Sequence, residues 1–419
     1  MARIVIIGGS LGGLMAAHML LRAGHDVQVL EKAASSLDGR GAGIVTHRPL
    51  MTALERCGLT IDGTLGVTVQ ERVVLAPDGA VAERAHISQV LTSWSRLYAM
   101  LSSVFDAKRM VYGASVSSVV QSTSSVRVHC DDGRSFEADL VVAADGIRST
   151  VRGQLLPQVQ PQYAGYVAWR GVCDEAVLSQ LTLKTVFDTF GFGVPPGEQL
   201  IGYPVAGAGN ATTRGQRRYN FVWYRPASEP ELKHLMTDAD GQHYPMGISP
   251  NKVAWRHVAA VRQVARELLA PQFAEMLEKT AQPFLQPIFD CATHQMAFDR
   301  VALLGDAAFV ARPHVGMGVT KAAEDAMALT DSIVAHGANA QALQAYQSMR
   351  LSPCLAVVQR ARALGAYMQA QSQQPSADRA AQQRDARSVM LETAIDLSQP
   401  TSGTNTPAFT PAFTPAFVH

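Results

Sequence analysis

The chain has 419 residues, 47% hydrophobic and 17% charged, so it can bury substantial cores in two or three domains and is not expected to be largely disordered. Its 36 basic and 35 acidic residues leave a formal net charge of +1, which gives no electrostatic reason to expect a nucleic-acid or anionic-membrane partner. A membrane span needs about 18 uninterrupted apolar residues, and because the sequence has no such run, no span is expected.

The first 31 residues have the pattern of a strand, a helix and a second strand. Residues 3–7 predict an apolar strand, residues 12–23 a helix, and residues 26–31 a second strand that ends in an acid. The turn GGSLGG joins the first strand to the helix. This is one βαβ unit of about the expected length, so the fold is predicted to open as α/β with a Rossmann-like domain.

The next hundred residues alternate between helical and extended patterns. A glycine-rich loop, GRGAGI, precedes an amphipathic helix within residues 40–60, and residues 67–86 predict a hairpin around the turn Pro77-Asp78-Gly79. A helix is expected at 93–106, followed by short strands. Residues 139–152, DLVVAADGIRSTVR, then restore the pattern of strand, turn and helix start.

The second half changes character twice. Residues from about 160 to 290 predict aromatic-rich strands separated by Gly and Pro turns, and residues 299–370 return to an apolar strand and long helices. The last stretch is rich in Gln, Ser, Ala and Pro and carries TPAF three times, which predicts a flexible or surface-wrapped tail, with a docking contact as the alternative. The expected division is an α/β domain in two parts, 1–158 and 293–370, a β-rich domain inserted between them at 159–292, and the tail at 371–419.

The five cysteines are scattered, and no C-x-x-C spacing suggests a metal site, a redox pair or a disulfide. They are interpreted as reduced thiols of a cytoplasmic protein, and no metal site is expected.

The turn after the first strand has the chemistry of a pyrophosphate site. Glycines there let the backbone approach a ligand held by the free N–H groups at the helix start. Glu31 follows Gly8 at about the spacing at which an acid binds an adenosine ribose. An acid at this position favours FAD or NAD over NADP. The cofactor-binding residues predicted here are Gly8, Gly9, Ser10, Leu11, Gly12, Gly13, Glu31 and Lys32.

Two further segments complete the predicted site. Asp145 and Gly146 follow a strand and precede a helix start that carries Arg152; a helix cap with a surface arginine is the alternative. Asp306 ends another apolar strand, where a buried acid needs partners such as ligand hydroxyls. The remaining predicted cofactor-binding residues, from these segments and from the glycine-rich loop, are Arg40, Gly43, Asp145, Gly146, Arg152, Gly305, Asp306, Pro313, Gly316 and Gly318.

With these three motifs in order, residues 3–365 resemble the class A FAD-dependent aromatic hydroxylases of the p-hydroxybenzoate hydroxylase type. The segments YAGYVAWRGV and GDAAFVARPH, followed by GMGVTKAAEDA, are most similar to the 2,6-dihydroxypyridine 3-hydroxylase branch. Phe309, Thr320 and Trp94 depart from the residues usual in the family. The sequence contains no second Rossmann unit, so NADH or NADPH would act as a transient electron donor without a domain of its own.

The resemblance implies an FAD-dependent monooxygenase that uses NAD(P)H and O2. Through a flavin C4a-hydroperoxide, it would hydroxylate a hydroxylated aromatic or N-heteroaromatic ring such as a hydroxypyridine. The expected partners are this small substrate and oxygen, and the expected assembly is a homodimer. The alternative is a flavin-dependent oxidase or reductase with a non-aromatic substrate.

The side chain that assists substrate deprotonation is not determined by the sequence. His47, Tyr203 and His314 are the candidates, each with a structural role as the alternative. Arg170, in the segment AWRG, is a candidate anchor for a substrate carboxylate, against the alternative of a salt bridge between domains.

Overall fold

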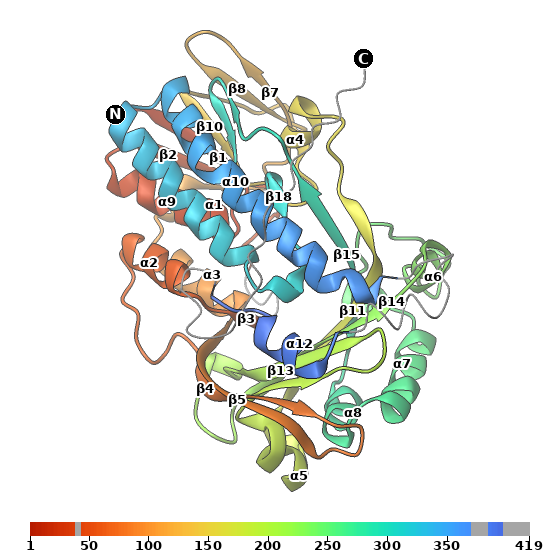
Figure 1. The fold of residues 1–419 in the computed structure, drawn as a ribbon. Coiled ribbons are helices and arrows are strands. Elements are labelled where there is room, and N and C mark those ends of the chain that lie inside the picture. The colour runs from red at the N-terminus through yellow and green to blue at the C-terminus, as the bar shows by residue number, and fades with distance from the viewer. Residues whose placement is uncertain (38–42, 370–383, 397–419) are drawn as a thin grey trace, which may run out of the picture.

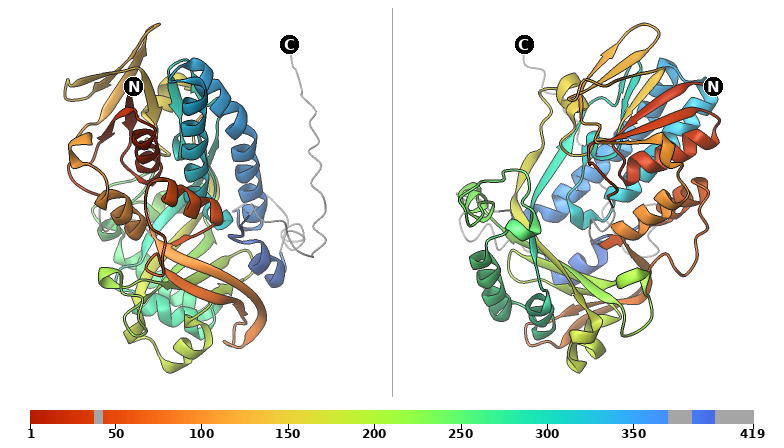
Figure 2. Two further views of the ribbon diagram at one scale, coloured as in Figure 1. Left: turned by 90° about the vertical axis from the view of Figure 1, so that its left-hand side faces the viewer. Right: turned by 180° about the vertical axis from the view of Figure 1, so that it is seen from behind.

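The computed structural model describes residues 1–37, 43–369 and 384–396. Arg40, the TPAF repeats and the first part of the predicted tail lie outside the described residues. The chain forms two stacked units, each built on a sheet (Figures 1 and 2). None of the described helices is both long and apolar enough to cross a membrane.

The first unit has a six-stranded sheet within the described residues. Its neighbouring strands are parallel except for the edge strand β16, which runs antiparallel to β17. The order is β16-β17-β10-β1-β2-β6. The strands are β1 (Arg3–Ile7), β2 (Asp26–Glu31), β6 (Met110–Tyr112), β10 (Leu140–Ala143), β16 (Ala297–Phe298) and β17 (Val301–Leu303).

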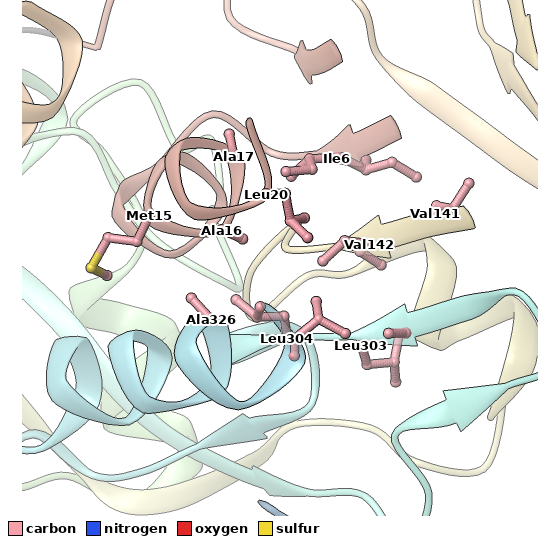
Figure 3. Close-up of a cluster of buried hydrophobic side chains, with 14 of the residues drawn as sticks. Ile6, Met15, Ala16, Ala17, Leu20, Val141, Val142, Leu303, Leu304 and Ala326 are labelled. Carbon is pink, nitrogen blue, oxygen red and sulfur yellow. The ribbon is translucent and has the colours of Figure 1, made fainter. Parts of the chain in front are cut away.

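Helices from both ends of the chain cover this sheet. Figure 3 shows Leu20 of the first helix and Ala326 of a late helix over Val142 and Leu303 of the central strands. These four side chains are fully buried, and their burial explains why the strands read as continuous apolar runs. The helices of this unit are α1 (Leu11–Arg22), α2 (Arg48–Arg56), α3 (Trp94–Ser103), α4 (Thr150–Leu155), α9 (Gly318–His336) and α10 (Ala340–Gly365).

A small antiparallel sheet lies beside the first unit. Its strands, in the order β7-β8-β9, are β7 (Val116–Gln121), β8 (Val126–Cys130) and β9 (Ser135–Ala138).

The second unit is a larger sheet with nine strands in the described part of the chain. Its order is β18-β15-β11-β14-β13-β12-β4-β5-β3. The strands are β3 (Gly43–Val45), β4 (Val67–Leu75), β5 (Val81–Ser93), β11 (Gln162–Asp174), β12 (Phe190–Gly193), β13 (Gln199–Val205), β14 (Arg218–Pro226), β15 (Phe284–Ala292) and β18 (Phe309–Val310).

Helices occupy much of the range that the sequence predicts to be mainly β. Figure 1 shows α7 (Trp255–Leu268) and α8 (Pro271–Lys279) beside this sheet, with α6 (Glu229–Leu235) nearby. The first two pack Val261 and Met276 into a core that also holds Trp223. The fold is therefore the expected α/β one with a strand-rich second unit, but that unit also has a helical layer.

The sheets do not divide the chain at the expected domain boundaries. β4 and β5, which lie within the predicted segment 1–158, join the second sheet because β4 pairs in parallel with β12. The division at residues 158, 292 and 370 stays a prediction, and strand membership favours counting β3, β4 and β5 with the second unit.

The predicted tail contains an ordered part. α12 (Ala386–Glu392) packs against β4 and β5, and Val389, Met390 and Ala394 are at most 1% exposed. These residues are therefore not flexible, because the second sheet covers their apolar side chains, whereas a segment wrapped onto the sheet agrees with the other form of the prediction.

Candidate active site

The glycine turn after β1 is as tight as the sequence predicts. Gly8 has a φ of +105°, and a Cβ there would lie 2.3 Å from the Ala144 carbonyl oxygen. A Cβ on Gly13 would lie 2.0 Å from the Gly8 carbonyl oxygen. Glycine is thus required at both positions for the turn to pass close to β10 and for α1 to pack on β1.

Glu31 ends β2 beside this turn. It is 7% exposed, and its carboxylate accepts hydrogen bonds from the Gly9 N–H at 2.9 Å and the Ala33 N–H at 2.8 Å. These bonds fix the carboxylate at the edge of a cavity of about 250 Å³. The predicted residues that line this cavity are Gly8, Ser10, Glu31, Lys32, Asp145 and Gly146. Gly9, Leu11, Gly12 and Gly13 are not among its lining residues.

Asp145 lies after β10 and faces the same cavity. One carboxylate oxygen accepts from the Val151 N–H, whereas the other is buried and has no hydrogen-bond partner in the described part of the chain. Burial raises the pKa of this carboxyl group. The alternative of a helix cap with a surface arginine holds in part: Asp145 binds an N–H in the first turn of α4, but the capping residue is Ser149, which accepts from the Arg152 N–H, and Arg152 is buried.

Arg152 lies beneath the site and lines neither cavity. It is 2% exposed, and its guanidinium donates to the carbonyl oxygens of Ile147, Asp306 and Ala307. It therefore joins the loop after β10 to the loop after β17, 154 residues later. Its predicted contact with the cofactor stays a prediction, whereas its role in joining the loops follows from these bonds.

Asp306 is not the buried acid that the sequence predicts. Asp306 is exposed, and its exposed surface faces a large cavity within the protein. The surrounding protein raises the pKa of its carboxyl group, chiefly through desolvation. Its side chain is thus available to a ligand in this cavity.

The buried acid is Asp325, one helical turn past Lys321 on α9. It is fully buried and accepts from the Gly305 N–H at 3.1 Å and from Arg350 Nε at 2.7 Å. Lys321 Nζ lies 3.6 Å from it and has no hydrogen-bond partner among the described residues. This cluster, which the sequence analysis missed, supports the Gly305–Asp306 turn from behind.

The larger cavity, of about 820 Å³, lies between the two units. One side is made by Ile147, Asp306, Pro313, Gly316 and Gly318, of which the last four are predicted site residues. The other side is the face of the second sheet. The sheet residues that line it include Gly43, Arg170, Ile201, Tyr203, Val222, Tyr224, Phe284, Gln286 and Ile288.

The three candidate catalytic residues differ in their access to this cavity. Tyr203 lines it from β13, and burial raises the pKa of its phenol to about 12. His47 lies behind the wall, with Nδ1 3.0 Å from the Thr320 hydroxyl, and burial lowers its pKa. His314 is fully buried between Tyr166 and the Ala361 carbonyl oxygen and does not line the cavity.

Together the two cavities fit an elongated dinucleotide. Asp145 and Gly146 line the smaller cavity, and the next residue, Ile147, lines the larger one. The glycine turn leaves no room for side chains, and an unpaired carboxylate oxygen of Asp145 remains for a ligand donor. These residues fit FAD, with the nucleotide at the smaller cavity and the ring toward the larger one. Fold and site together define a flavin-dependent oxidoreductase.

Comparisons with known proteins agree. A family model described as FAD binding domain matches residues 1–100 and 243–361, and one described as FAD binding domain-like matches residues 163–290. The 2,6-dihydroxypyridine 3-monooxygenase of Paenarthrobacter nicotinovorans is 31% identical over 368 residues, which are 88% of this chain and 91% of the relative. The 3-amino-4-hydroxybenzoate 2-monooxygenase of Streptomyces cremeus is 28% identical, with 86% of each chain covered.

The solved structure of 2,6-dihydroxypyridine-3-hydroxylase from Arthrobacter nicotinovorans is similar with a TM-score of 0.83 and 30% identity. The match covers 90% of this chain and 95% of that one. The chain belongs to the FAD binding domain family of class A flavoprotein hydroxylases. It is an FAD-dependent monooxygenase that takes its electrons from NAD(P)H, and the alternative of an oxidase or reductase is not favoured.

Proposed function

We propose that this monooxygenase hydroxylates a small hydroxylated aromatic or N-heteroaromatic ring of the hydroxypyridine kind, bound as an anion. The observation that carries the proposal is a charged group in the larger cavity. Arg170 lines this cavity, donates from Nη1 to Gln286 at 2.8 Å, and has no carboxylate partner among the described residues. The names of the two relatives that act on hydroxypyridine and aminohydroxybenzoate rings support the same class.

Arg170 and its neighbours would bind and orient the ring. The alternative of a salt bridge between domains finds no support, since the partner of Arg170 is a neutral amide on β15. Its Nε is buried and has no hydrogen-bond partner among the described residues, while the residue as a whole is half-buried. A guanidinium in this state favours an anionic oxygen on the substrate and lowers the pKa of a ring hydroxyl. An ionised hydroxyl makes the neighbouring ring carbon more nucleophilic.

The cavity wall supplies the other requirements of the reaction. Ile201, Val222 and Ile288 make the sheet face apolar, which holds a flat ring and excludes water. Tyr203 stays protonated at neutral pH, since its pKa is raised to about 12. We therefore assign it as a hydrogen-bond donor rather than a base.

His47 is the better candidate for the proton acceptor. It is 2% exposed, its lowered pKa keeps the ring neutral, and its Nδ1 contacts the Thr320 hydroxyl at the start of α9. Thr320 follows Gly318 and Val319, which line the larger cavity, so its hydroxyl would have to pass the proton from that wall to His47. When bound, FAD would supply the redox chemistry that couples NAD(P)H oxidation to the insertion of one oxygen atom of O2 into the ring.

The test is a panel of hydroxypyridines and hydroxybenzoates added to the FAD-loaded protein. The proposal expects at least one hydroxypyridine to stimulate NADH or NADPH consumption and to gain one oxygen by mass spectrometry. If every compound leaves consumption at its basal rate, the proposed substrate class is wrong. A non-hydroxylated ring of equal size serves as the matched control, because it lacks the group that Arg170 would ionise.

Two coarser expectations are proposed with it. A homodimer can be tested by light scattering coupled to size-exclusion chromatography. A cytoplasmic location is supported by the five cysteines, which are all unpaired and buried, and can be tested by fractionation of cells that express the protein.

A further inference from the structure

A segment near the carboxy terminus, residues 385–396, contributes to the wall of the larger cavity. We call it the carboxy-terminal strap. It consists of the capping residue Asp385, α12 and the four residues that follow α12, and Figure 1 shows α12 between the second sheet and the late helices. Among its residues, Ala394 lines the cavity.

Arg72 on β4 fastens the strap from below. It is fully buried, and its guanidinium donates to the carbonyl oxygens of Met390 at 2.8 Å, Thr393 at 2.6 Å and Ala394 at 3.1 Å. Its other hydrogen bond goes to Gln89. No carboxylate pairs with it among the described residues, so carbonyl dipoles of the strap stabilise this buried cation. Burying a charge is costly unless it has such partners, and without the strap the Arg72 guanidinium would lose three of its hydrogen-bond acceptors.

Ala394 packs closely against the loop that contains His314 and Gly316. Its backbone is left-handed, with a φ of +51°, and its N–H donates to the His314 carbonyl oxygen at 3.1 Å. A Cβ on Gly316 would lie 2.6 Å from the Ala394 Cβ. Gly316 thus has to be glycine because the strap occupies the space where a side chain would lie. Neither residue can become larger without separating strap and loop.

The strap also contacts the candidate proton acceptor. The Ala394 carbonyl oxygen lies 3.5 Å from His47 Nε2 and also accepts from Gln89 Nε2 at 3.0 Å. A carbonyl oxygen can only accept, so this contact favours the His47 tautomer with its proton on Nε2. Nδ1 is then an acceptor, and it lies 3.0 Å from the Thr320 hydroxyl.

We propose that the carboxy-terminal strap is part of the active site. Through the Ala394 carbonyl it holds His47 with a proton on Nε2 and an acceptor at Nδ1, and through the Ala394 side chain it closes the cavity beside Gly316. Ala394 is thus a positioning residue that acts through His47. The use of the Nδ1 acceptor in catalysis rests on the proposed function, whereas the tautomer and the closed wall do not.

The test compares full-length, FAD-loaded proteins by three measurements that require no substrate. These are ¹⁵N chemical shifts of the His47 ring, amide hydrogen exchange of residues 385–396, and quenching of flavin fluorescence by iodide. The first variant is Arg72→Met, which removes the three hydrogen bonds from Arg72 to the strap. The second is Gln89→Leu, which removes the hydrogen bond between Arg72 and Gln89 and the one from Gln89 to the Ala394 carbonyl oxygen. The matched control is Arg84→Met on the adjacent strand, an arginine that pairs with Glu71 and not with the strap.

In the unmodified protein, His47 should show the Nε2–H tautomer. Arg72→Met should raise amide exchange in the strap by about tenfold or more, mix the His47 tautomers and increase iodide quenching. Gln89→Leu should shift all three in the same direction by less, and Arg84→Met should shift none.

An Nδ1–H tautomer in the unmodified protein would overturn the proposal. So would a released strap that leaves the His47 signals and the iodide quenching unchanged. If Arg72→Met does not fold, the same comparison is decided by Gln89→Leu, whose side chain is half-buried. Since no substrate is involved, failure of the compound panel leaves this result intact.

Discussion

Replacing Arg152 by methionine should separate the two loops that face the flavin. The side chain is 2% exposed and donates to three backbone carbonyl oxygens on loops that are far apart in sequence. Methionine has a similar length and is apolar, so it fills the space without replacing the donors. The Ala307 carbonyl group then loses its partner in a buried position, and those of Ile147 and Asp306 lose theirs in partly buried positions.

The expected cost follows from those three groups. A buried carbonyl group left without its donor costs about 1–3 kcal/mol, and water can partly replace the donor at the two partly buried groups, so the apo protein should lose about 2–4 kcal/mol of unfolding free energy. Two of the released carbonyl groups are those of Asp306 and Ala307, so FAD affinity should also fall. The loss should be about tenfold for each 1.4 kcal/mol of FAD binding free energy that is used to restore the loop around Asp306.

The assay is urea unfolding of the apo protein followed by fluorescence titration with FAD. Arg300→Met is the matched control, because Arg300 also donates to backbone carbonyl oxygens, those of Thr123 and Asp139, but is only half-buried and lies at the opposite end of β17. Water can replace its bonds, so the control should lose about 1 kcal/mol or less. If both variants lose the same free energy and bind FAD equally, the assignment of Arg152 as the link between the loops is wrong.

Three other predictions concern single residues. Asp306→Asn should weaken FAD binding by about tenfold or more, because a charged acceptor is lost, and normal yellow protein after gel filtration would contradict this. Arg170→Met should raise KM for an anionic ring or waste NAD(P)H as peroxide, with Arg170→Lys partly restoring coupling; an unchanged product yield would remove Arg170 from the site. Burial lowers the pKa of His314 to about 3 in the folded state, whereas it is about 6.5 in the unfolded state. Below about pH 6.5 the unfolded state therefore binds a proton that the folded state does not, so the free energy of unfolding is highest above this pH and falls as the pH drops. From about pH 7.5 to 5.5, His314 should lower the free energy of unfolding by about 1.4 kcal/mol. His314→Gln should remove this loss from the free energies of unfolding measured in urea across that pH range, whereas an equal slope in both proteins would show that the pKa of His314 is not depressed.

The cofactor side of the site could be predicted because its determinants are local. Gly8 and Glu31 lie within one βαβ unit, and Asp145 and Asp306 each follow an apolar strand, so residue type and spacing carry the information. Parallel strands place their carboxyl ends at one edge of a sheet, which brings these residues together once the strands are recognised.

The rest depends on contacts between residues that are distant in sequence. Asp325 was missed because a polar residue in a helix is usually exposed, and its burial follows from Arg350 on another helix. The strap was missed because its composition resembles that of a tail. One local signal existed: Arg72 begins the run RVVL, which is buried throughout in β4, and a charged residue directly before three apolar ones indicates a specific partner.

The order of the strands along the chain has a consequence for how the enzyme is made. β17 supplies the Asp306 loop to a sheet that begins with β1, so a ribosome must translate more than 300 residues before both sides of the flavin site exist. The wall at Ala394 follows almost 90 residues after Asp306. At about 5–20 residues per second, the nascent chain spends tens of seconds with its apolar strands made and its cofactor site incomplete. Flavin supply and chaperone protection during that interval, rather than the stability of the finished protein alone, should therefore set the yield of active enzyme.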